Sequence, residues 1–299
     1  MNRKRVVTGC FCILFILLLY AVGKRYVFPT VERNVEETVI LPGHTRAKPP
    51  DIEIHRQKIG KGKEKITYFA AEIRLSDATD LRAAFAQNQY GLNVKDTVSG
   101  MAQEHDAVFA VNGDYYGYRT DGIVLRNGVL YRDKPTGRDC LVMYKDGTVR
   151  AMREGTVSGE KLVEQGAWNV FSFGPVLVKR GKICSGLDEP YKVDLLNVSI
   201  SGKQPRTGIG ILGKNHLLIV AVDGRSEGYS CGMTFQEFAQ LFADYGCKLA
   251  YNLDGGGSVT MYQKGRILNR PSLGRERRIS DVIYIGKKQK SSRKRRKGR

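Results

Sequence analysis

The chain has 299 residues, of which 49 are Lys or Arg and 30 are Asp or Glu, giving a formal net charge of +19. Nine basic residues lie in 287–299 and five in 1–25, so only +5 is left for residues 26–286. This mildly basic central part argues against a nucleic-acid-binding domain. A hydrophobic content of 41% is enough for a core, and only four histidines without a Cys/His cluster argue against a histidine-rich metal site.

The first 25 residues are predicted to direct export. Three basic residues precede a run of seventeen mostly apolar residues from Val6 to Val22, and Lys24 and Arg25 follow it. That length is near the lower limit for a membrane span, and a basic front end keeps the N-terminus in the cytoplasm. An uncleaved single-pass signal anchor is favoured, with a signal peptide cleaved near Gly23 and a buried core helix as alternatives. The rest of the chain is then expected outside the cell membrane.

Composition divides the remaining chain into three parts. Residues 26–50 hold four prolines among charged residues, which predicts a linker. A domain is expected over 51–286. The basic tail, 287–299, is predicted to be disordered, either solvated or in contact with anionic lipid or wall polymer. Four cysteines in the exported part allow three pairings, and free buried thiols are equally compatible with the sequence: Cys140, Cys184, Cys231 and Cys247.

Strands dominate the predicted elements. Runs rich in β-branched and aromatic residues predict strands within 51–59, 65–75, 107–117, 122–131, 140–152, 168–183, 206–225, 248–253, 258–268 and 277–286. Asn127-Gly128 and Asp146-Gly147 predict tight hairpin turns. A short helix is expected within 96–105. The pattern therefore predicts an α+β fold, a strand-rich single domain around a mixed β-sheet with few helices, behind the N-terminal membrane anchor.

A second, amphipathic helix is expected over 233–247. Thr234 and Glu237 have the spacing of a capping box, apolar residues recur at helical spacing, and Gly246 is a typical C-terminal stop.

Two motifs match catalytic patterns without the required context. Gly208 to Gly213 fits G-x-G-x-x-G, but a strand follows where a dinucleotide site needs a helix. Gly228 to Gly232 fits G-x-S-x-G, but no histidine follows Ser230, as a nucleophile elbow requires. Neither a dinucleotide cofactor nor this type of serine hydrolase is expected.

Polar clusters follow three apolar strands. Asn112, Asp223 and Asp254 each come directly after or at the end of such a strand, where sites often form. The N–H groups of the three glycines after Asp254 could form an anion-binding concavity. Two carboxylates are typical of glycosyl transfer, and Arg206 and Arg225 suit bidentate phosphate contacts. Each cluster is also compatible with an ordinary turn, and the glycine triplet with a bulge.

The segment NLDGGGSVTM, residues 252–261, closely resembles the signature of the phosphodiester glycosidase family. Six further segments are similar to the family in the same order, so the resemblance covers about 95–286: 110–116, 173–182, 204–212, 222–242, 269–272 and 277–285. Asp114 and Val259 depart from the family pattern mildly.

The resemblance implies hydrolysis of the bond between a sugar's anomeric carbon and a phosphate oxygen. The catalytic residues that it suggests are Asp254, Asp223 and Arg206. The substrate-binding residues that it suggests are Asn112, Thr207, Arg225, Asn252, Gly255, Gly256, Gly257, Ser258 and Thr260. No cofactor is expected, although a cation with oxygen ligands only, such as calcium, stays open.

The function expected from the sequence is that of an exported glycosidase that cleaves a sugar-1-phosphate diester in a cell-envelope glycopolymer or related glycoconjugate. A non-catalytic protein that binds anionic polysaccharide or assists wall assembly is the alternative. The sequence does not choose the sugar, the anomer, the polymer, the oligomeric state or the carboxylate that acts as acid, base or nucleophile.

Overall fold

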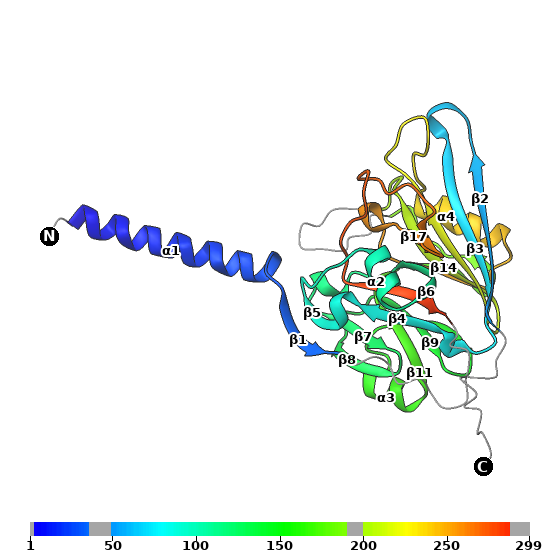
Figure 1. Cartoon of the computed structure of the whole chain (residues 1–299), viewed down its shortest axis with the longest axis horizontal. Coiled ribbons are helices and arrows are strands. Elements are labelled where there is room, and N and C mark those ends of the chain that lie inside the picture. Colours follow the sequence, from blue (N-terminus) through cyan, green and yellow to red (C-terminus); the bar gives the residue numbers. More distant parts are fainter. Residues whose placement is uncertain (1–2, 36–48, 190–199, 288–299) are drawn as a thin grey trace, which may run out of the picture.

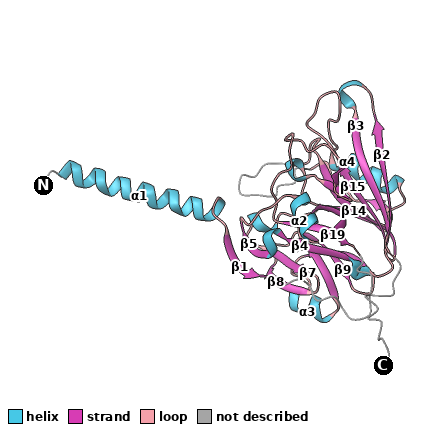
Figure 2. Cartoon of the chain, in the orientation of Figure 1, coloured by secondary structure: helices cyan, strands magenta, loops and turns pink. Residues whose placement is uncertain are grey.

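Strands are the most common regular secondary structure in the described chain (Figures 1 and 2). The computed structural model describes residues 3–35, 49–189 and 200–287. Its α-helices are α1 (Arg3–Tyr26), α2 (Val98–Glu104), α3 (Gly159–Glu164) and α4 (Phe235–Asp244). The predicted tail 287–299 lies, apart from its first residue, outside the described residues.

The strands form four sheets. The seven-stranded sheet has the order β13 (Lys182–Ile183), β12 (Val176–Lys179), β16 (Leu249–Asn252), β14 (Arg206–Gly213), β15 (His216–Val222), β3 (Ile66–Arg74) and β2 (Asp51–Ile59). One five-stranded sheet has the order β18 (Arg266–Ile267), β17 (Met261–Gln263), β6 (Ala107–Asn112), β19 (Asp281–Gly286) and β4 (Leu81–Phe85). The other has β10 (Val149–Arg153), β9 (Asp139–Tyr144), β11 (Ala167–Phe171), β7 (Gly122–Arg126) and β8 (Val129–Lys134). Strands β1 (Thr30–Asn34) and β5 (Gln89–Leu92) form a separate pair.

The predicted mixed sheet is wrong, because the named strands of the described chain pair antiparallel throughout. The strand–helix–strand unit β15–α4–β16 does not produce a parallel pair. In the structure β14 lies between β15 and β16 and is antiparallel to both, since Gly208 of β14 partners Val220 on one side and Asn252 on the other. The helix therefore crosses over one intervening strand.

Two cores lie on opposite faces of the seven-stranded sheet. One contains residues of all three large sheets, among them Phe69, Phe109 and Phe171. The other packs the sheet against α4 through its phenylalanines. A Cβ on Gly208 would lie 2.9 Å from the ring of Phe238, and one on Gly210 would lie 2.6 Å from the ring of Phe242. The G-x-G pattern here is thus a packing feature, which agrees with the rejected dinucleotide motif.

The predicted cap of α4 is confirmed. The Thr234 hydroxyl accepts a hydrogen bond from the Glu237 N–H (3.1 Å), and the Glu237 carboxylate accepts one from the Thr234 N–H (2.8 Å). Gly246, at a φ of +78°, follows the helix end.

Replacing Thr234 with alanine should lower the free energy of unfolding by about 1 kcal/mol, because one N-terminal N–H of the helix loses its acceptor. Urea unfolding of the variant beside Thr120→Ala, an exposed threonine, measures this difference. Equal unfolding midpoints for the two variants would contradict the prediction.

The N-terminal segment contacts the rest of the chain through β1. This strand pairs with β5 from Thr30 to Asn34, and the Arg33 guanidinium lies 5.2 Å from the centre of the Tyr131 ring. Part of the predicted linker 26–50 is therefore a strand. Within the described residues, no helix is long and apolar enough to cross a membrane. The membrane anchor stays a prediction.

The four cysteines of the predicted exported part are free thiols: Cys140, Cys184, Cys231 and Cys247. Burial raises the pKa of the Cys140 and Cys247 thiols to about 12. These two side chains behave as small core residues.

Candidate active site

The structure brings together polar groups at the ends of two strands, β6 and β16, and near the start of a third, β14. Asn112 ends β6, Asn252 ends β16, and Asp254 follows two residues later. The Asn112 side-chain amide donates a hydrogen bond to the Asp254 carbonyl (2.8 Å), and its oxygen accepts one from the Thr207 hydroxyl (2.7 Å). These bonds tie the end of a five-stranded sheet to the seven-stranded sheet. Three of the predicted site residues, Asn112, Thr207 and Asp254, therefore lie together in the fold.

The glycine turn 255–257 does not form the expected anion-binding concavity. The Gly255 N–H donates to the Asp254 carboxylate (2.9 Å), and the Gly256 N–H donates to the Pro205 carbonyl (2.9 Å). Two of the three glycine N–H groups thus already donate hydrogen bonds within the protein. The glycines instead leave space for neighbouring side chains. A Cβ on Gly256 would lie 3.0 Å from Nη2 of Arg225.

A second arginine approaches the same turn. A Cβ on Gly257 would lie 3.4 Å from Cδ of Arg277. Arg225 and Arg277 therefore lie close to neighbouring glycines, and a side chain at Gly256 would push against the Arg225 guanidinium. The Arg225 guanidinium is held by the Gln204 side-chain oxygen (2.9 and 2.7 Å) and is exposed.

Asp254 is the predicted catalytic residue that is still partly exposed. Burial raises the pKa of its carboxyl, while the Ser258 hydroxyl, the Arg277 guanidinium and the Gly255 N–H act in the opposite direction. A carboxyl with a raised pKa, in a partly exposed residue and beside a cation, has the properties of a group that exchanges protons with a substrate.

Asp223 lies in a different environment. Its side chain is 1% exposed and accepts hydrogen bonds from the Tyr229 hydroxyl (2.8 Å), the Asn269 amide (2.9 Å) and the Arg270 N–H (3.0 Å). Burial raises the pKa of Asp223, and these donors partly offset the rise. Both oxygens of this carboxylate accept hydrogen bonds from protein groups. The expected catalytic role of Asp223 stays a prediction.

Arg206 is 2% exposed and holds backbone rather than facing the site. Its guanidinium donates to the carbonyls of Met233 (2.8 Å), Ile200 (2.7 Å) and Gly202 (2.7 Å) and lies 3.8 Å from the centre of the Phe235 ring. Burial lowers the pKa of Arg206 to about 9. Its geometry fits a structural residue, and its expected contact with phosphate stays a prediction.

Two of the predicted substrate-binding residues have side-chain oxygens without a hydrogen-bond partner in the described part of the chain. They are Oδ1 of Asn252 and Oγ1 of Thr260. The Asn252 amide nitrogen donates to the Gly174 carbonyl (2.8 Å). Buried oxygens of this kind are usually satisfied, so these two are available to a ligand or to water. Their expected role in binding stays a prediction.

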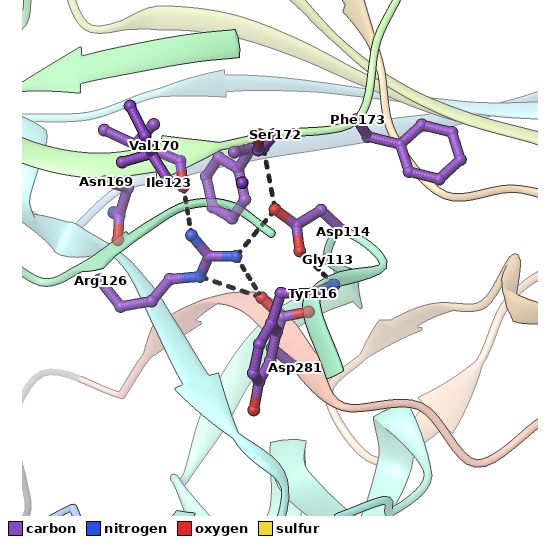
Figure 3. A network of polar contacts seen from close by, with 12 residues as sticks. Gly113, Asp114, Tyr116, Ile123, Arg126, Asn169, Val170, Ser172, Phe173 and Asp281 are labelled. Carbon is purple, nitrogen blue, oxygen red and sulfur yellow. Dashed lines mark hydrogen bonds and ion pairs between the residues drawn. The ribbon is translucent and has the colours of Figure 1, made fainter. Parts of the chain in front are cut away.

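Beneath the site, Arg126 joins two buried aspartates (Figure 3). Its Nη2 lies 3.1 Å from Oδ2 of Asp114 and 2.9 Å from Oδ2 of Asp281, and Nη1 donates to the Val170 carbonyl. Asp114 also accepts from the Ser172 N–H (2.9 Å). This network connects the loop after β6 with β7, β11 and the start of β19.

The pKa values of the two carboxyls in this network are shifted in opposite directions. Burial raises the pKa of Asp114, but the guanidinium groups of Arg126 and Arg119 outweigh it, and the net shift is downward. Burial raises the pKa of Asp281, Arg126 opposes the rise, and the negative charge of Asp114 adds to it. The Arg126 guanidinium therefore contacts both carboxyls. Of the two, Asp281 has the higher pKa and is protonated more readily than Asp114.

Sequence reasoning missed five residues around the site: Tyr118, Tyr229, Asn269, Arg277 and Asp281. Four of them lie in segments that resemble the family: Tyr229 in 222–242, Asn269 in 269–272, and Arg277 and Asp281 in 277–285. The sequence signal that could have identified these residues is a polar side chain within a segment that resembles the family. Nothing in the local pattern distinguished Arg277 from its neighbours Arg275 and Arg278.

No group of three or more His, Cys, Asp or Glu side chains that could hold a metal lies among residues 3–35, 49–189 and 200–287.

The sequence model of the family "Phosphodiester glycosidase" matches residues 105–286. The chain belongs to this family, and membership supports a hydrolase of glycosidase type.

Other known proteins are similar to this chain in sequence or in fold. The SPbeta prophage-derived uncharacterized protein YomE of Bacillus subtilis (strain 168) is 34% identical over 205 residues, which are 66% of this chain and 30% of that protein. The catalytic domain of zebrafish N-acetylglucosamine-1-phosphodiester alpha-N-acetylglucosaminidase, auto-inhibited by its pro-peptide, has a similar fold. Its TM-score is 0.66 at 19% identity, over 87% of this chain and 88% of that one. A hypothetical protein from Synechocystis has a TM-score of 0.58 at 14% identity, over 80% of this chain and 64% of that one.

Proposed function

We propose that the protein hydrolyses a sugar-1-phosphate diester with Asp254 at the anomeric centre. The observation that carries this proposal is the partly exposed Asp254 carboxyl, with a raised pKa, between the glycine turn and Arg277. Family membership supports this choice of bond. An export signal at residues 1–25 would place the reaction outside the cytoplasm, where a cell-envelope glycopolymer or a related glycoconjugate is the proposed substrate.

The chemistry needs only one reacting carboxylate. The C1–O bond of the sugar breaks, water supplies the new C1–O bond, and the products are a free sugar and a phosphomonoester. Most glycosidases need a second acid to protonate a poor leaving group. A phosphomonoester has a second pKa of about 6 and leaves as a stable anion. Asp254 therefore acts as the base for water or as the nucleophile, and the proton of water ends on solvent or on the phosphate.

The buried residues position this carboxylate. Asp223 holds the segment that begins at Asn269, and the Asn269 amide also donates to the Val259 carbonyl (3.0 Å) next to the glycine turn. Asn112 holds the backbone of Asp254 itself. We propose positioning roles for these residues, since their side chains are 1% to 7% exposed and contact protein groups.

Release of free sugar tests the proposal. The purified full-length protein is incubated with UDP-sugars and with methyl diesters of several sugar-1-phosphates, and free sugar is followed over many turnovers. Catalytic release that is lost in Asp254→Ala supports the proposal. Stoichiometric binding of envelope polymers without turnover on any of these substrates would favour the alternative, a polysaccharide-binding protein.

The acidic limb of the pH–rate profile should report Asp254. Because the carboxylate form is needed, kcat/KM falls as the pH drops through the pKa of Asp254, which burial places above the usual value of about 4. Replacing Arg277 with methionine removes a charge that lowers this pKa, so the limb should move to higher pH. The profile of Arg150→Met, a basic residue on β10, is the control. An acidic limb at the same pH in all three proteins would contradict the assignment.

A further inference from the structure

A pair of stacked tyrosines carries two cations beside Asp254. Tyr115 and Tyr118 stack with ring centres 4.5 Å apart and planes 13° apart. Nζ of Lys95 lies 4.5 Å, and Cζ of Arg277 5.4 Å, from the centre of the Tyr118 ring. We call these four residues the Tyr118 platform. Aromatic faces attract cations, so the rings fix where the two charges lie.

Neither charge of the Tyr118 platform forms an ion pair with a carboxylate in the described part of the chain, although the Asp254 carboxylate interacts with Arg277 over a longer distance. Both lie over one ring, so they are at most about 10 Å apart, which is about one Debye length at physiological salt. No carboxylate in the described part of the chain lies within 4 Å of either as an ion pair. Burial lowers the pKa of Lys95, and the positive charges of Arg277 and Arg278 lower it further. A bound anion would relieve this repulsion.

The Tyr118 platform adjoins the glycine turn. Arg277 packs over Gly257, and its charge interacts with the Asp254 carboxylate. The stacked tyrosines belong to the loop that begins at Asn112, whose amide holds the Asp254 carbonyl. An anion on the platform therefore lies next to the proposed reacting carboxylate, on the side of the turn where Arg277 lies.

We propose that the Tyr118 platform binds the phosphate of the substrate on the leaving-group side, with the scissile C1–O bond between the platform and Asp254. This inference rests on the proposed function. Two cations match the dianionic phosphomonoester that the reaction releases, and a guanidinium offers paired donors to its oxygens. The platform would hold the developing negative charge as the C1–O bond breaks and would also retain the product. Phosphomonoesters are therefore expected to inhibit the enzyme.

Calorimetric titration of the full-length protein with methyl phosphate tests the site without any turnover. Lys95→Met and Arg277→Met should each weaken methyl phosphate binding at least tenfold. Lys161→Met, which removes a charge from the exposed helix α3, should bind as the unchanged protein does. In activity measurements Lys95→Met should raise KM and the inhibition constant of methyl phosphate more than it changes kcat. Lys95→Gln repeats the test if the methionine variant melts at a lower temperature.

The outcomes separate this inference from the proposed function. Methyl phosphate binding that depends on Lys95 and Arg277, with no sugar released from any diester, would retain the phosphate site and overturn the reaction. Sugar release with wild-type KM and methyl phosphate affinity in both variants would retain the reaction and overturn the site. Acetate that competes as well as methyl phosphate would identify a general carboxylate site and would also overturn the inference.

Discussion

Replacing Asp254 with asparagine should lower kcat/KM by about 10²- to 10⁴-fold, the usual contribution of a positioned acid or base. The amide keeps the size of the side chain and its contact with the Gly255 N–H, but it neither accepts a proton from water nor attacks C1. The loss should appear mainly in kcat, because Asp254 acts on the reacting bond rather than on the phosphate. Initial rates of sugar release against substrate concentration measure both constants.

Two comparisons make the Asp254→Asn result interpretable. Asp244→Asn on the exposed end of α4 removes the same charge far along the chain from the glycine turn, and it should keep full activity. The thermal unfolding temperature of Asp254→Asn should be equal to or above that of the unchanged protein, since a carboxylate whose charged form is disfavoured by desolvation is replaced by a neutral group. A variant that is folded and retains more than a tenth of kcat/KM would remove Asp254 from the reaction.

Local sequence signals predicted the elements better than their arrangement. The Asn127-Gly128 and Asp146-Gly147 turns and the Thr234 cap depend on backbone conformations that a few residues determine, and the structure has all three. Strand neighbours depend on contacts far along the chain. The β15–α4–β16 unit has the pattern of a parallel crossover, yet the intervening β14 made the mixed-sheet prediction wrong.

For the site, too, local features were predicted from the sequence and long-range contacts were not. The sequence located Asp254 and the glycine turn because a costly glycine triplet after a strand is a strong local signal. It did not show that Arg206 is buried against Phe235, since burial of a long side chain is decided by packing with distant elements. Arg277 was missed in the sequence because its place in the site also depends on distant elements. It lies in a run of basic residues, and only the fold brings it over the glycine turn.

Replacing Arg126 with methionine should lower the free energy of unfolding by about 3–5 kcal/mol, the usual result of removing one partner from a buried ion pair. Arg126 is 1% exposed, and the carboxyls of Asp114 and Asp281 both depend on it. Without the guanidinium these two acids are buried near one another with no cation between them. The predicted loss is a large part of a typical domain stability of about 5–15 kcal/mol. Urea unfolding at pH 7.5 measures it.

The size of this loss should depend on pH. In the unchanged protein the lowered pKa of Asp114 contributes stability above its usual pKa, and this contribution is lost as the pH falls through the folded value. The raised pKa of Asp281 acts in the other direction, so its contribution falls as pH rises through its folded value. In Arg126→Met both acids have raised pKa values, because the cation that lowered them is gone. The penalty should therefore be smaller at pH 5 than at pH 7.5.

Arg132→Met is the matched control for the Arg126 network. Arg132 is also buried, but its guanidinium donates to the carbonyls of Gly122 (3.1 Å) and Arg119 (2.6 Å) rather than to carboxylates. Its loss leaves no unpaired acid, so its penalty should be nearly the same at both pH values. Adding Asp281→Asn to Arg126→Met should recover part of the stability at pH 7.5, since one of the two unpaired charges is removed. A pH-independent penalty for Arg126→Met, or no recovery in the double variant, would mean that Arg126 stabilises the fold by packing rather than by joining the two acids beneath Asp254.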